Sequence, residues 1–273
     1  MYTVGSLFTG IGGLDLGLER AGMTVRWQVE RDPWCQRVLA KHWPDVPRYK
    51  NVENVGVDLE PVDLICGGFP CQPVSQAGQQ KGTDDDRWLW PEFQRIVGLL
   101  RPRYVLVENV PGLFTANGGH AFGEVIGGLA DSGYDCEWSV LSAADVGAPH
   151  RRKRVWIVAY STSNRWGSRG TECAGLWGWP SSECPDSLAH ADSEGLEGRK
   201  LLPERPSERT IGETGLDDRR IFGGPVGGDW AVEPDVGRVA HGIPKRVDRL
   251  RGLGNAVVPQ CVEWIGRRIM EHL

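Results

Sequence analysis

Apolar and polar positions alternate in blocks along the first 160 residues, and each block has the length of one secondary-structure element. Apolar runs that suit buried strands cover residues 4–8, 24–29, 49–52, 62–66, 104–107, 136–141 and 155–159. The segments between them carry apolar side chains at helical spacing, which predicts helices over residues 34–42, 91–100 and 122–131, and one containing Leu14 and Leu18 that Gly22 ends. Strands that alternate with helices predict an α/β protein with a buried parallel sheet.

The pattern breaks down after this block. From about residue 161 to 228 the chain is rich in Gly, Ser, Pro, Glu and Arg, and no helix or strand period runs through residues 192–215. Such a composition is typical of a loop-rich insertion. Regularity returns at Arg246 and ends in an amphipathic helix that reaches Ile269. We therefore divide the chain into residues 1–160, an irregular region at 161–244, and a segment at 245–273 that returns to the first domain.

A glycine-rich turn, Thr-Gly-Ile-Gly-Gly at residues 9–13, lies between the first predicted strand and the first helix. Glycines let the backbone approach a ligand closely, and a helix start offers free N–H groups. Glu30 ends the second strand twenty residues beyond Gly10, a spacing at which a carboxylate can bond a ribose hydroxyl. Such a turn can also merely pack a helix on a sheet, and its glycine order matches neither an ATPase loop nor a dinucleotide fingerprint. Together, the turn and Glu30 predict a ligand that carries a ribose.

The segment Cys-Gly-Gly-Phe-Pro-Cys-Gln-Pro-Val-Ser, residues 66–75, leaves the carboxyl end of the fourth predicted strand, where open α/β sheets place their ligands. Pro70 fixes the backbone just before Cys71, which makes the Cys71 thiol a candidate nucleophile. A lone cysteine is more often a small buried hydrophobic residue, and catalysis requires a lowered thiol pKa and a partner. The polar residues from Ser75 to Arg87 predict an exposed loop that closes over the site.

Three charged side chains are further candidates for the same site. Glu108 stands at the carboxyl end of the fifth predicted strand, so it emerges beside Cys71 if the two strands are parallel neighbours. A strand-end carboxylate judged alone is more often a surface group. Arg152 and Arg154 lead directly into the apolar strand at 155–159, which predicts that some of these guanidinium groups point into a site.

The distribution of charge matters more than its sum. The 273-residue chain has a net charge of −5, which alone disfavours a nucleic-acid partner. However, six basic residues and no acidic residue lie between Asp145 and Glu172, and a second basic cluster occupies residues 245–251. Basic runs are usually solvated surfaces, so this pattern alone favours neither nucleic-acid binding nor a solvated surface.

Cysteine content and hydropathy indicate the cellular compartment of the protein. Seven cysteines without regular spacing favour reduced thiols over a secreted disulfide framework, and no apolar run has membrane-spanning length or the form of a signal peptide. We therefore expect a cytoplasmic protein without a membrane partner. Cys173, Cys184 and His190 match no zinc spacing and have no evident fourth ligand, so we expect no metal.

In their order along the chain, these motifs resemble those of the DNA cytosine-5 methyltransferase family, and the resemblance covers most of the sequence. Phe-Thr-Gly-Ile-Gly-Gly at residues 8–13 is similar to the family's S-adenosylmethionine loop, and Gly-Phe-Pro-Cys-Gln at 68–72 to its catalytic loop. Glu-Asn-Val at 108–110, His-x-Arg-x-Arg at 150–154 and Gly-Asn-Ala-Val at 254–257 resemble three further motifs. The resemblance implies a Rossmann-like S-adenosylmethionine-dependent methyltransferase sheet with a small target-recognition lobe at 161–244.

The resemblance also implies roles for individual residues. The catalytic residues would be Cys71, Glu108, Arg152 and Arg154. The cofactor-binding residues would be Phe8, Gly10, Gly12, Gly13, Glu30, Asn51, Val52, Pro70, Leu89 and Asn255. The substrate-binding residues would be Gln72, Ser75, Asn109 and His150. Two positions depart from the family pattern: His150 stands in place of a glutamine, and Asn51 in place of an acidic residue beside the adenine, whose amino group an asparagine can still bind.

The implied reaction is methylation of carbon 5 of a cytosine within a specific double-stranded DNA sequence. The Cys71 thiolate would add to carbon 6 while protonated Glu108 holds ring nitrogen 3, which requires a raised carboxyl pKa. Arg154, and with it Arg152, would bind the carbonyl oxygen at position 2 and a phosphate. The base would flip out of the duplex, and the loop at 75–87 would become ordered only with DNA bound. We expect a monomer, encoded by a bacterium or a phage and of restriction–modification type.

Three alternatives stay open. An RNA cytosine-5 methyltransferase could share the Pro-Cys-Gln motif and act on tRNA. A non-catalytic DNA-binding regulator could keep the fold, although the intact set of Cys71, Glu108 and Arg154 disfavours it. A nicotinamide-dependent oxidoreductase is disfavoured by the imperfect glycine fingerprint.

Overall fold

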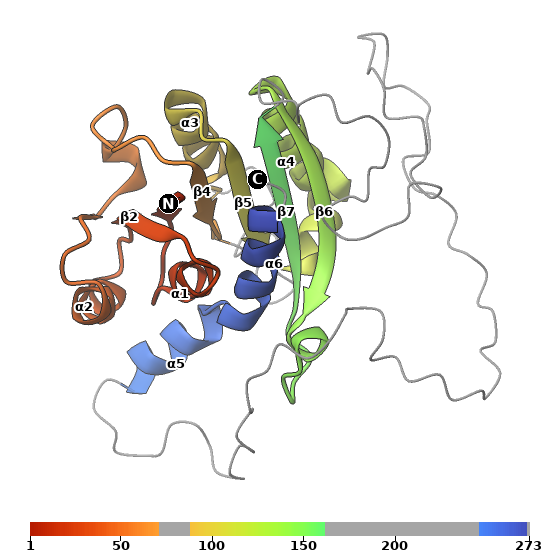
Figure 1. Cartoon of the computed structure of the whole chain (residues 1–273). Coiled ribbons are helices and arrows are strands. Elements are labelled where there is room, and N and C mark those ends of the chain that lie inside the picture. The colour runs from red at the N-terminus through yellow and green to blue at the C-terminus, as the bar shows by residue number, and fades with distance from the viewer. Residues whose placement is uncertain (71–87, 162–245, 272–273) are drawn as a thin grey trace, which may run out of the picture. The chain divides into compact units, whose positions relative to one another are not determined.

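The computed structural model describes residues 1–70, 88–161 and 246–271, and all of these belong to one compact unit of the chain (Figure 1). Their strands are β1 (Thr3–Leu7), β2 (Thr24–Val29), β3 (Arg48–Tyr49), β4 (Leu64–Gly67), β5 (Tyr104–Asn109), β6 (Tyr134–Ser142) and β7 (Lys153–Ser161). These form a single sheet in the order β3-β2-β1-β4-β5-β7-β6. The predicted target-recognition lobe falls almost wholly outside the described residues, so the proposed division of the chain stays a prediction.

The strands β1 to β5 run parallel, as the sequence predicts. β1 pairs with β2 and β4, β3 pairs with β2, and β5 pairs with β4. The long strand β7 runs antiparallel between β5 and β6. The pairing of β4 with β5 brings the end of the strand that precedes Cys71 and the end of the strand that carries Glu108 to the same edge of the sheet. The expected Rossmann-like architecture is therefore confirmed.

The helices of the described residues cover both faces of the sheet. They are α1 (Gly13–Arg20), α2 (Pro33–His42), α3 (Trp90–Leu100), α4 (His120–Asp131), α5 (Arg246–Asn255) and α6 (Pro259–Glu271), with short 3₁₀ turns η1 (Val52–Asn54), η3 (Pro111–Phe114), η4 (Ala116–Gly119) and η5 (Ala143–Val146). α1 and α6 lie side by side (Figure 1), because Gly17 and Gly266 leave room for the other helix where a side chain would overlap it. The end of the chain is thereby packed against its beginning.

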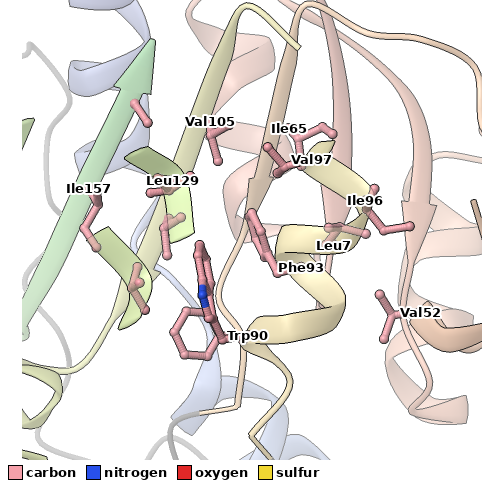
Figure 2. Close-up of a cluster of buried hydrophobic side chains, with 14 of the residues drawn as sticks. Leu7, Val52, Ile65, Trp90, Phe93, Ile96, Val97, Val105, Leu129 and Ile157 are labelled. Atoms are coloured by element: carbon pink, nitrogen blue, oxygen red, sulfur yellow. The ribbon is translucent and has the colours of Figure 1, made fainter. Parts of the chain in front are cut away.

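The main hydrophobic core lies between the sheet and the helices α3 and α4. In Figure 2, Phe93, Ile96 and Val97 of α3 lie against Leu7 and Ile65 of the strands, and all five are fully buried. Burying an apolar side chain of this size contributes about 1.5–3 kcal/mol. This packing fixes α3, and with it the chain that enters α3, relative to the carboxyl ends of β1 and β4.

Two elements differ from the prediction. β3 ends at Tyr49, not at residue 52, because the chain turns into η1, where Arg95 Nη2 donates to the carbonyl oxygens of Val52 (2.8 Å) and Val55 (2.9 Å). The helix α5 was not predicted, since its sequence is dominated by charged residues and glycines and shows no apolar face.

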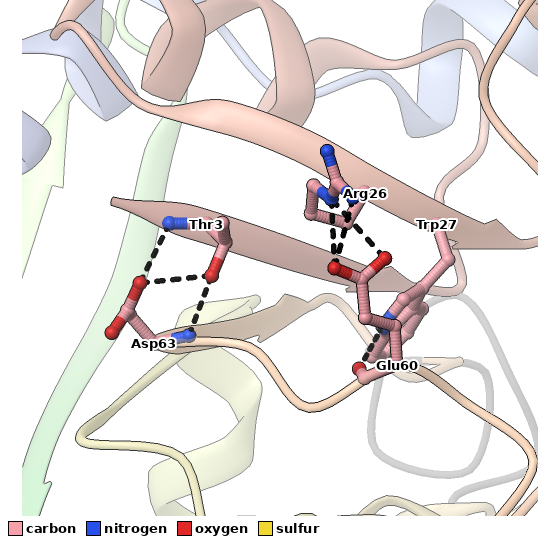
Figure 3. Close-up of polar contacts among 5 residues, drawn as sticks. All are labelled: Thr3, Arg26, Trp27, Glu60 and Asp63. Atoms are coloured by element: carbon pink, nitrogen blue, oxygen red, sulfur yellow. Dashed lines mark hydrogen bonds and ion pairs between the residues drawn. The ribbon is translucent and has the colours of Figure 1, made fainter. Parts of the chain in front are cut away.

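Polar contacts hold the amino ends of β1 and β4 together at the edge opposite the predicted site (Figure 3). The Thr3 backbone N–H and hydroxyl donate to Asp63 Oδ2 at 2.9 and 2.8 Å. In the same loop, Arg26 pairs with the carboxylate of Glu60, and Trp27 Nε1 donates to the Glu60 carbonyl oxygen at 2.8 Å. These contacts fix the register of β1 against β4 and therefore the relative positions of the loops that leave their other ends.

Candidate active site

The glycine turn leaves β1 in a backbone conformation with positive φ angles. Gly10 has a φ of +60°, which glycine adopts without strain, and Phe8 has a φ of +53°, which side chains rarely adopt. The Thr9 backbone N–H donates to the Val29 carbonyl oxygen (3.1 Å), and the ring of Phe8 stacks on Phe93 with centroids 6.4 Å apart. Backbone strain of this kind is typical of ligand-binding turns.

Glu30 connects this turn to α2. Its Oε2 accepts a hydrogen bond from the Gly10 N–H and its Oε1 accepts one from the Asp32 N–H, both at 2.7 Å. Asp32 in turn caps α2, because its Oδ1 accepts from the N–H groups of Trp34 (2.8 Å) and Cys35 (3.1 Å). The carboxylate of Glu30 is therefore held in one orientation at the carboxyl edge of the sheet.

A cavity of about 460 Å³ opens at this edge. Most of the predicted site residues that the structure describes line it: Phe8, Gly10, Gly13, Glu30, Asn51, Val52, Pro70, Leu89, Glu108, Asn109, Arg154 and Asn255. Gly12, His150 and Arg152 are not among the lining residues. Cys71, Gln72 and Ser75, together with the predicted lid at 75–87, lie outside the described residues. The cavity thus joins the predicted cofactor residues to the predicted catalytic pair in one space.

Glu108 and Arg154 form an ion pair in this cavity. Arg154 Nε lies 2.8 Å from Glu108 Oε1, because the antiparallel pairing of β5 with β7 places the two side chains next to each other. Burial raises the pKa of the Glu108 carboxyl above its ordinary value, and the positive charges of Arg154 and Arg152 oppose this rise without cancelling it. The carboxyl can therefore hold a proton at a higher pH than an exposed glutamate can.

The backbone around Glu108 is fitted to its side chain. A Cβ at Gly68 would lie 2.7 Å from Glu108 Oε2, so only glycine leaves room for the carboxylate. The neighbouring Asn109 accepts a hydrogen bond from the Val110 N–H at 2.9 Å, and its amide nitrogen lies 3.5 Å from the Phe69 carbonyl oxygen. The ends of β4 and β5 are thus held together directly before Pro70.

Aromatic side chains fix the chain on either side of residues 71–87. Phe69 contacts Trp88 edge to face and Trp90 at a tilt, with ring centroids 5.2 and 5.6 Å apart. Trp88 Nε1 also donates to Glu124 Oε1 of α4 at 2.9 Å. The positions from which the chain leaves for Cys71 and returns are therefore set by packing.

Three cysteines within the described ranges, Cys66, Cys136 and Cys261, are poor nucleophiles. Burial raises the pKa of the Cys66 thiol well above its ordinary value, and burial raises the pKa of both Cys136 and Cys261 to about 12. A thiol that stays protonated does not attack. Cys71 remains the candidate nucleophile that the sequence predicts.

Sequence reasoning missed part of the cavity lining. Trp34, Lys50, Asp248 and Gly252 also line it. The position of Trp34 was readable, because Trp34 follows the cap of α2 just after the strand that ends near Glu30. Asp248 and Gly252 belong to α5, whose sequence gave no signal for a helix. Gly12 instead packs against the ring of Trp43, which occupies the space of a side chain at that position.

Neither a metal centre nor a membrane-spanning helix is found in the described part of the chain. No three His, Cys, Asp or Glu side chains of residues 1–70, 88–161 and 246–271 gather so that they could hold a metal ion. No helix within these ranges is long and apolar enough to cross a membrane. Cys173, Cys184 and His190, which the sequence analysis considered as metal ligands, lie outside the described residues.

The fold and the cavity define the class of protein as a Rossmann-like S-adenosylmethionine-dependent methyltransferase. A crystal structure of a protein described as a DNA modification methyltransferase encoded within an E. coli prophage superposes with a TM-score of 0.51 at 29% identity, over 60% of this chain and 47% of that one. The methyltransferase EhMeth of Entamoeba histolytica also gives a TM-score of 0.51, at 23% identity, over 59% of this chain and 53% of that one, and shows the same fold.

The family follows from the sequence match. Residues 2–199 match the model of the C-5 cytosine-specific DNA methylases, and the chain belongs to this family of DNA cytosine-5-methyltransferases. It is 29% identical to the type II methyltransferase M2.BsuMI of Bacillus subtilis, over 97% of this chain and 75% of that protein. It is 31% identical to M.NaeI of Lentzea aerocolonigenes over 97% and 73%, and 36% identical to M.NgoFVII of Neisseria gonorrhoeae over 56% and 42%.

This membership confirms the resemblance seen in the motifs. It sets aside the nicotinamide-dependent oxidoreductase, since the matched family transfers methyl groups. The chain spans about three quarters of the length of two of these relatives and less than half of the third.

Proposed function

We propose that this protein transfers the methyl group of S-adenosylmethionine to carbon 5 of a flipped-out cytosine in a specific double-stranded DNA sequence. The observation that carries the proposal is the buried Glu108–Arg154 pair in the same cavity as the glycine turn and Pro70, the residue before Cys71. The relatives are named type II methyltransferases, which supports a role of restriction–modification type. Because DNA is the proposed substrate, we place the protein in the cytoplasm of a bacterial cell.

The cavity residues fit S-adenosylmethionine. Gly10 would let the backbone approach the ligand closely, and the orientation of Glu30 would suit a bond to ribose hydroxyls. The ring of Phe8 and the side chain of Val52 offer apolar contact to an adenine. The amide oxygen of Asn51 can accept a hydrogen bond from the adenine amino group. When bound, the cofactor supplies a methyl group activated by a sulfonium. Asn255, Leu89 and Pro70 lie around the same space.

Cys71 would act as the nucleophile. Carbon 5 of cytosine is a poor nucleophile, and addition of the Cys71 thiolate to carbon 6 makes it electron-rich. Pro70 lines the cavity, which supports delivery of the next residue to the same space. After methyl transfer, loss of the proton on carbon 5 and expulsion of the Cys71 thiolate restore the aromatic ring and the free enzyme.

Glu108 and Arg154 would stabilise the ring while it carries charge. The raised pKa of Glu108 favours the protonated form, which can donate a hydrogen bond to ring nitrogen 3. Arg154 would donate to the carbonyl oxygen at position 2, a contact that strengthens as negative charge develops there. The contact of 2.8 Å between Arg154 Nε and Glu108 Oε1 would hold both side chains beside the base.

The target base must leave the duplex to reach this pocket, because the sulfur attacks the face of the ring. Flipping a base out costs on the order of a few kcal/mol, which pocket contacts offset. Gln72, Ser75, Asn109 and His150 remain proposed substrate contacts, and residues 161–244 remain the proposed region for reading the flanking bases. The loop at 75–87 remains the proposed lid over the flipped base.

Two assays test the proposal. Wild-type protein with labelled S-adenosylmethionine should methylate duplex DNA and not tRNA, and it should form a covalent adduct with duplex DNA that carries 5-fluorocytosine at the target. Cys71→Ser should abolish both, whereas Cys136→Ser, a matched control at a thiol with a raised pKa that does not line the cavity, should retain both. Methylation of tRNA alone would favour the RNA methyltransferase instead. An adduct that persists in Cys71→Ser would refute the role of Cys71.

A further inference from the structure

The C-terminal segment at residues 252–257 forms one wall of the cavity, and three contacts hold it. The ring of Trp34 occupies the space that a side chain at Gly252 would need. Gly13 approaches the Val257 carbonyl so closely that a Cβ there would lie 2.8 Å from the oxygen. The third contact is a hydrogen bond of 2.7 Å from Arg152 Nη2 to the carbonyl oxygen of Gly254. The first two come from the half of the site with the glycine turn, whereas Arg152 directly precedes β7.

The two arginines of the basic motif have different contacts. Arg154 lines the cavity and pairs with Glu108 at 2.8 Å. Arg152 is not among the lining residues, and its guanidinium donates to a backbone carbonyl 102 positions further along the chain. Arg152 is nevertheless close enough for its charge to act on Glu108. Its position therefore bridges the strand pair that carries the catalytic carboxyl and the wall that the end of the chain supplies.

We propose that Arg152 is a positioning residue that holds the wall at 252–257 against the sheet edge bearing Glu108, and thereby sets the affinity for the cofactor. This inference rests on the proposed use of the cavity for S-adenosylmethionine. A hydrogen bond from a charged donor is stronger than one between neutral groups. The planar guanidinium carries five N–H donors in a fixed fork, so it can hold the Gly254 carbonyl while its charge faces the carboxyl. The role differs from direct contact with the cytosine or a phosphate.

The test is the affinity for S-adenosylhomocysteine in the absence of DNA, measured by titration calorimetry on the full chain. Arg152→Ala should weaken binding about tenfold, the effect of losing one charge-assisted hydrogen bond. Arg152→Lys should recover part of the affinity, because an ammonium can still donate to the Gly254 carbonyl. Lys153→Ala, an exposed neighbour of the same charge, should bind as the wild type does.

Kinetics separate positioning from other roles. Arg152→Ala should raise the KM for S-adenosylmethionine more than it lowers kcat, and its unfolding midpoint without cofactor should match that of the wild type. A residue that contacts the cytosine would lower kcat and leave DNA-free cofactor affinity unchanged, and that result would overturn the inference. A lowered midpoint without recovery of affinity in Arg152→Lys would overturn it as well. Wild-type protein that fails to bind S-adenosylhomocysteine would overturn the proposed function along with the inference, whereas equal affinities of the wild type and Arg152→Ala overturn the inference alone.

Discussion

A buried carboxyl below the glycine turn gives the fold a defined dependence on pH. Asp15 of α1 is fully buried and accepts hydrogen bonds from Ser6 Oγ and Gln28 Nε2, both at 3.0 Å. Burial raises the pKa of Asp15 from 3.8 to about 6, although both hydrogen bonds lower it. The native state therefore binds this proton more tightly than the unfolded state does. Stability from this group is fully present below pH 3.8 and is lost as the pH rises through 6.

The magnitude follows from the shift. Each pKa unit is worth about 1.36 kcal/mol, so ionised Asp15 lowers the free energy of unfolding by about 3 kcal/mol at pH 8. At pH 5 the same linkage gives about 1.6 kcal/mol, because the unfolded chain is already ionised and the native one is not. Asp15→Asn cannot ionise, and its amide can donate to the Ser6 hydroxyl while its oxygen accepts from Gln28. The stability of Asp15→Asn relative to the wild type should thus increase by about 1.4 kcal/mol from pH 5 to pH 8.

Urea unfolding followed by circular dichroism at several values between pH 5 and pH 8 measures this difference directly. Comparing the variant with the wild type at each pH removes the contribution of every other titrating group. Asp131→Asn, which removes a carboxyl from an exposed position at the end of α4, provides the control. A stability difference between Asp15→Asn and the wild type that stays constant from pH 5 to pH 8 would refute the reasoning.

Two predictions concern Glu108, the proposed catalytic carboxyl. Glu108→Gln should keep its affinity for S-adenosylhomocysteine and lose most turnover. The kcat of the wild type should fall at high pH, where Glu108 loses its proton, and this fall should be absent from the residual activity of Glu108→Gln. Unchanged turnover in Glu108→Gln would remove Glu108 from the acid role. Gly68→Ala should lower kcat about tenfold or more, because a Cβ 2.7 Å from Glu108 Oε2 must displace the carboxylate by part of an ångström; the same substitution at Gly98, whose Cβ would meet open space, should leave kcat unchanged.

The sequence was sufficient where neighbours along the chain decide the structure. The Asp32-Pro33 pair predicts the start of α2, and the cap is seen in the hydrogen bonds to Trp34 and Cys35. Likewise, apolar runs predict the strands, and the parallel pairing of β4 with β5 follows from their burial and from the helix α3 in the connection between them. Glu108 could therefore be placed at the edge from which the chain leaves for Cys71.

The sequence was insufficient to predict the structure where a contact joins segments that lie far apart along the chain. Arg152 and Arg154 look alike in the sequence. Their different contacts, Arg152 with the Gly254 carbonyl and Arg154 with Glu108, depend on how distant segments meet in the fold. The helix α5 has only three apolar residues among charged residues and glycines, so its sequence gave no clear sign of a helix. Asp15 is likewise hidden in an ordinary amphipathic pattern, although in the fold it lies between Ser6 and Gln28 of two strands.

The cavity is completed by the end of the chain, and this links its affinity for ligands to the packing of the last helix. Gly17 of α1 faces Val262 of α6 without room for a side chain, and Gly13, at the start of α1, faces Val257 in the same way. The N–H groups at the start of α1 and the wall at 252–257 are therefore positioned by one interface. A change that shifts α6 along α1 should move the wall relative to the glycine turn and so change the shape of this side of the cavity.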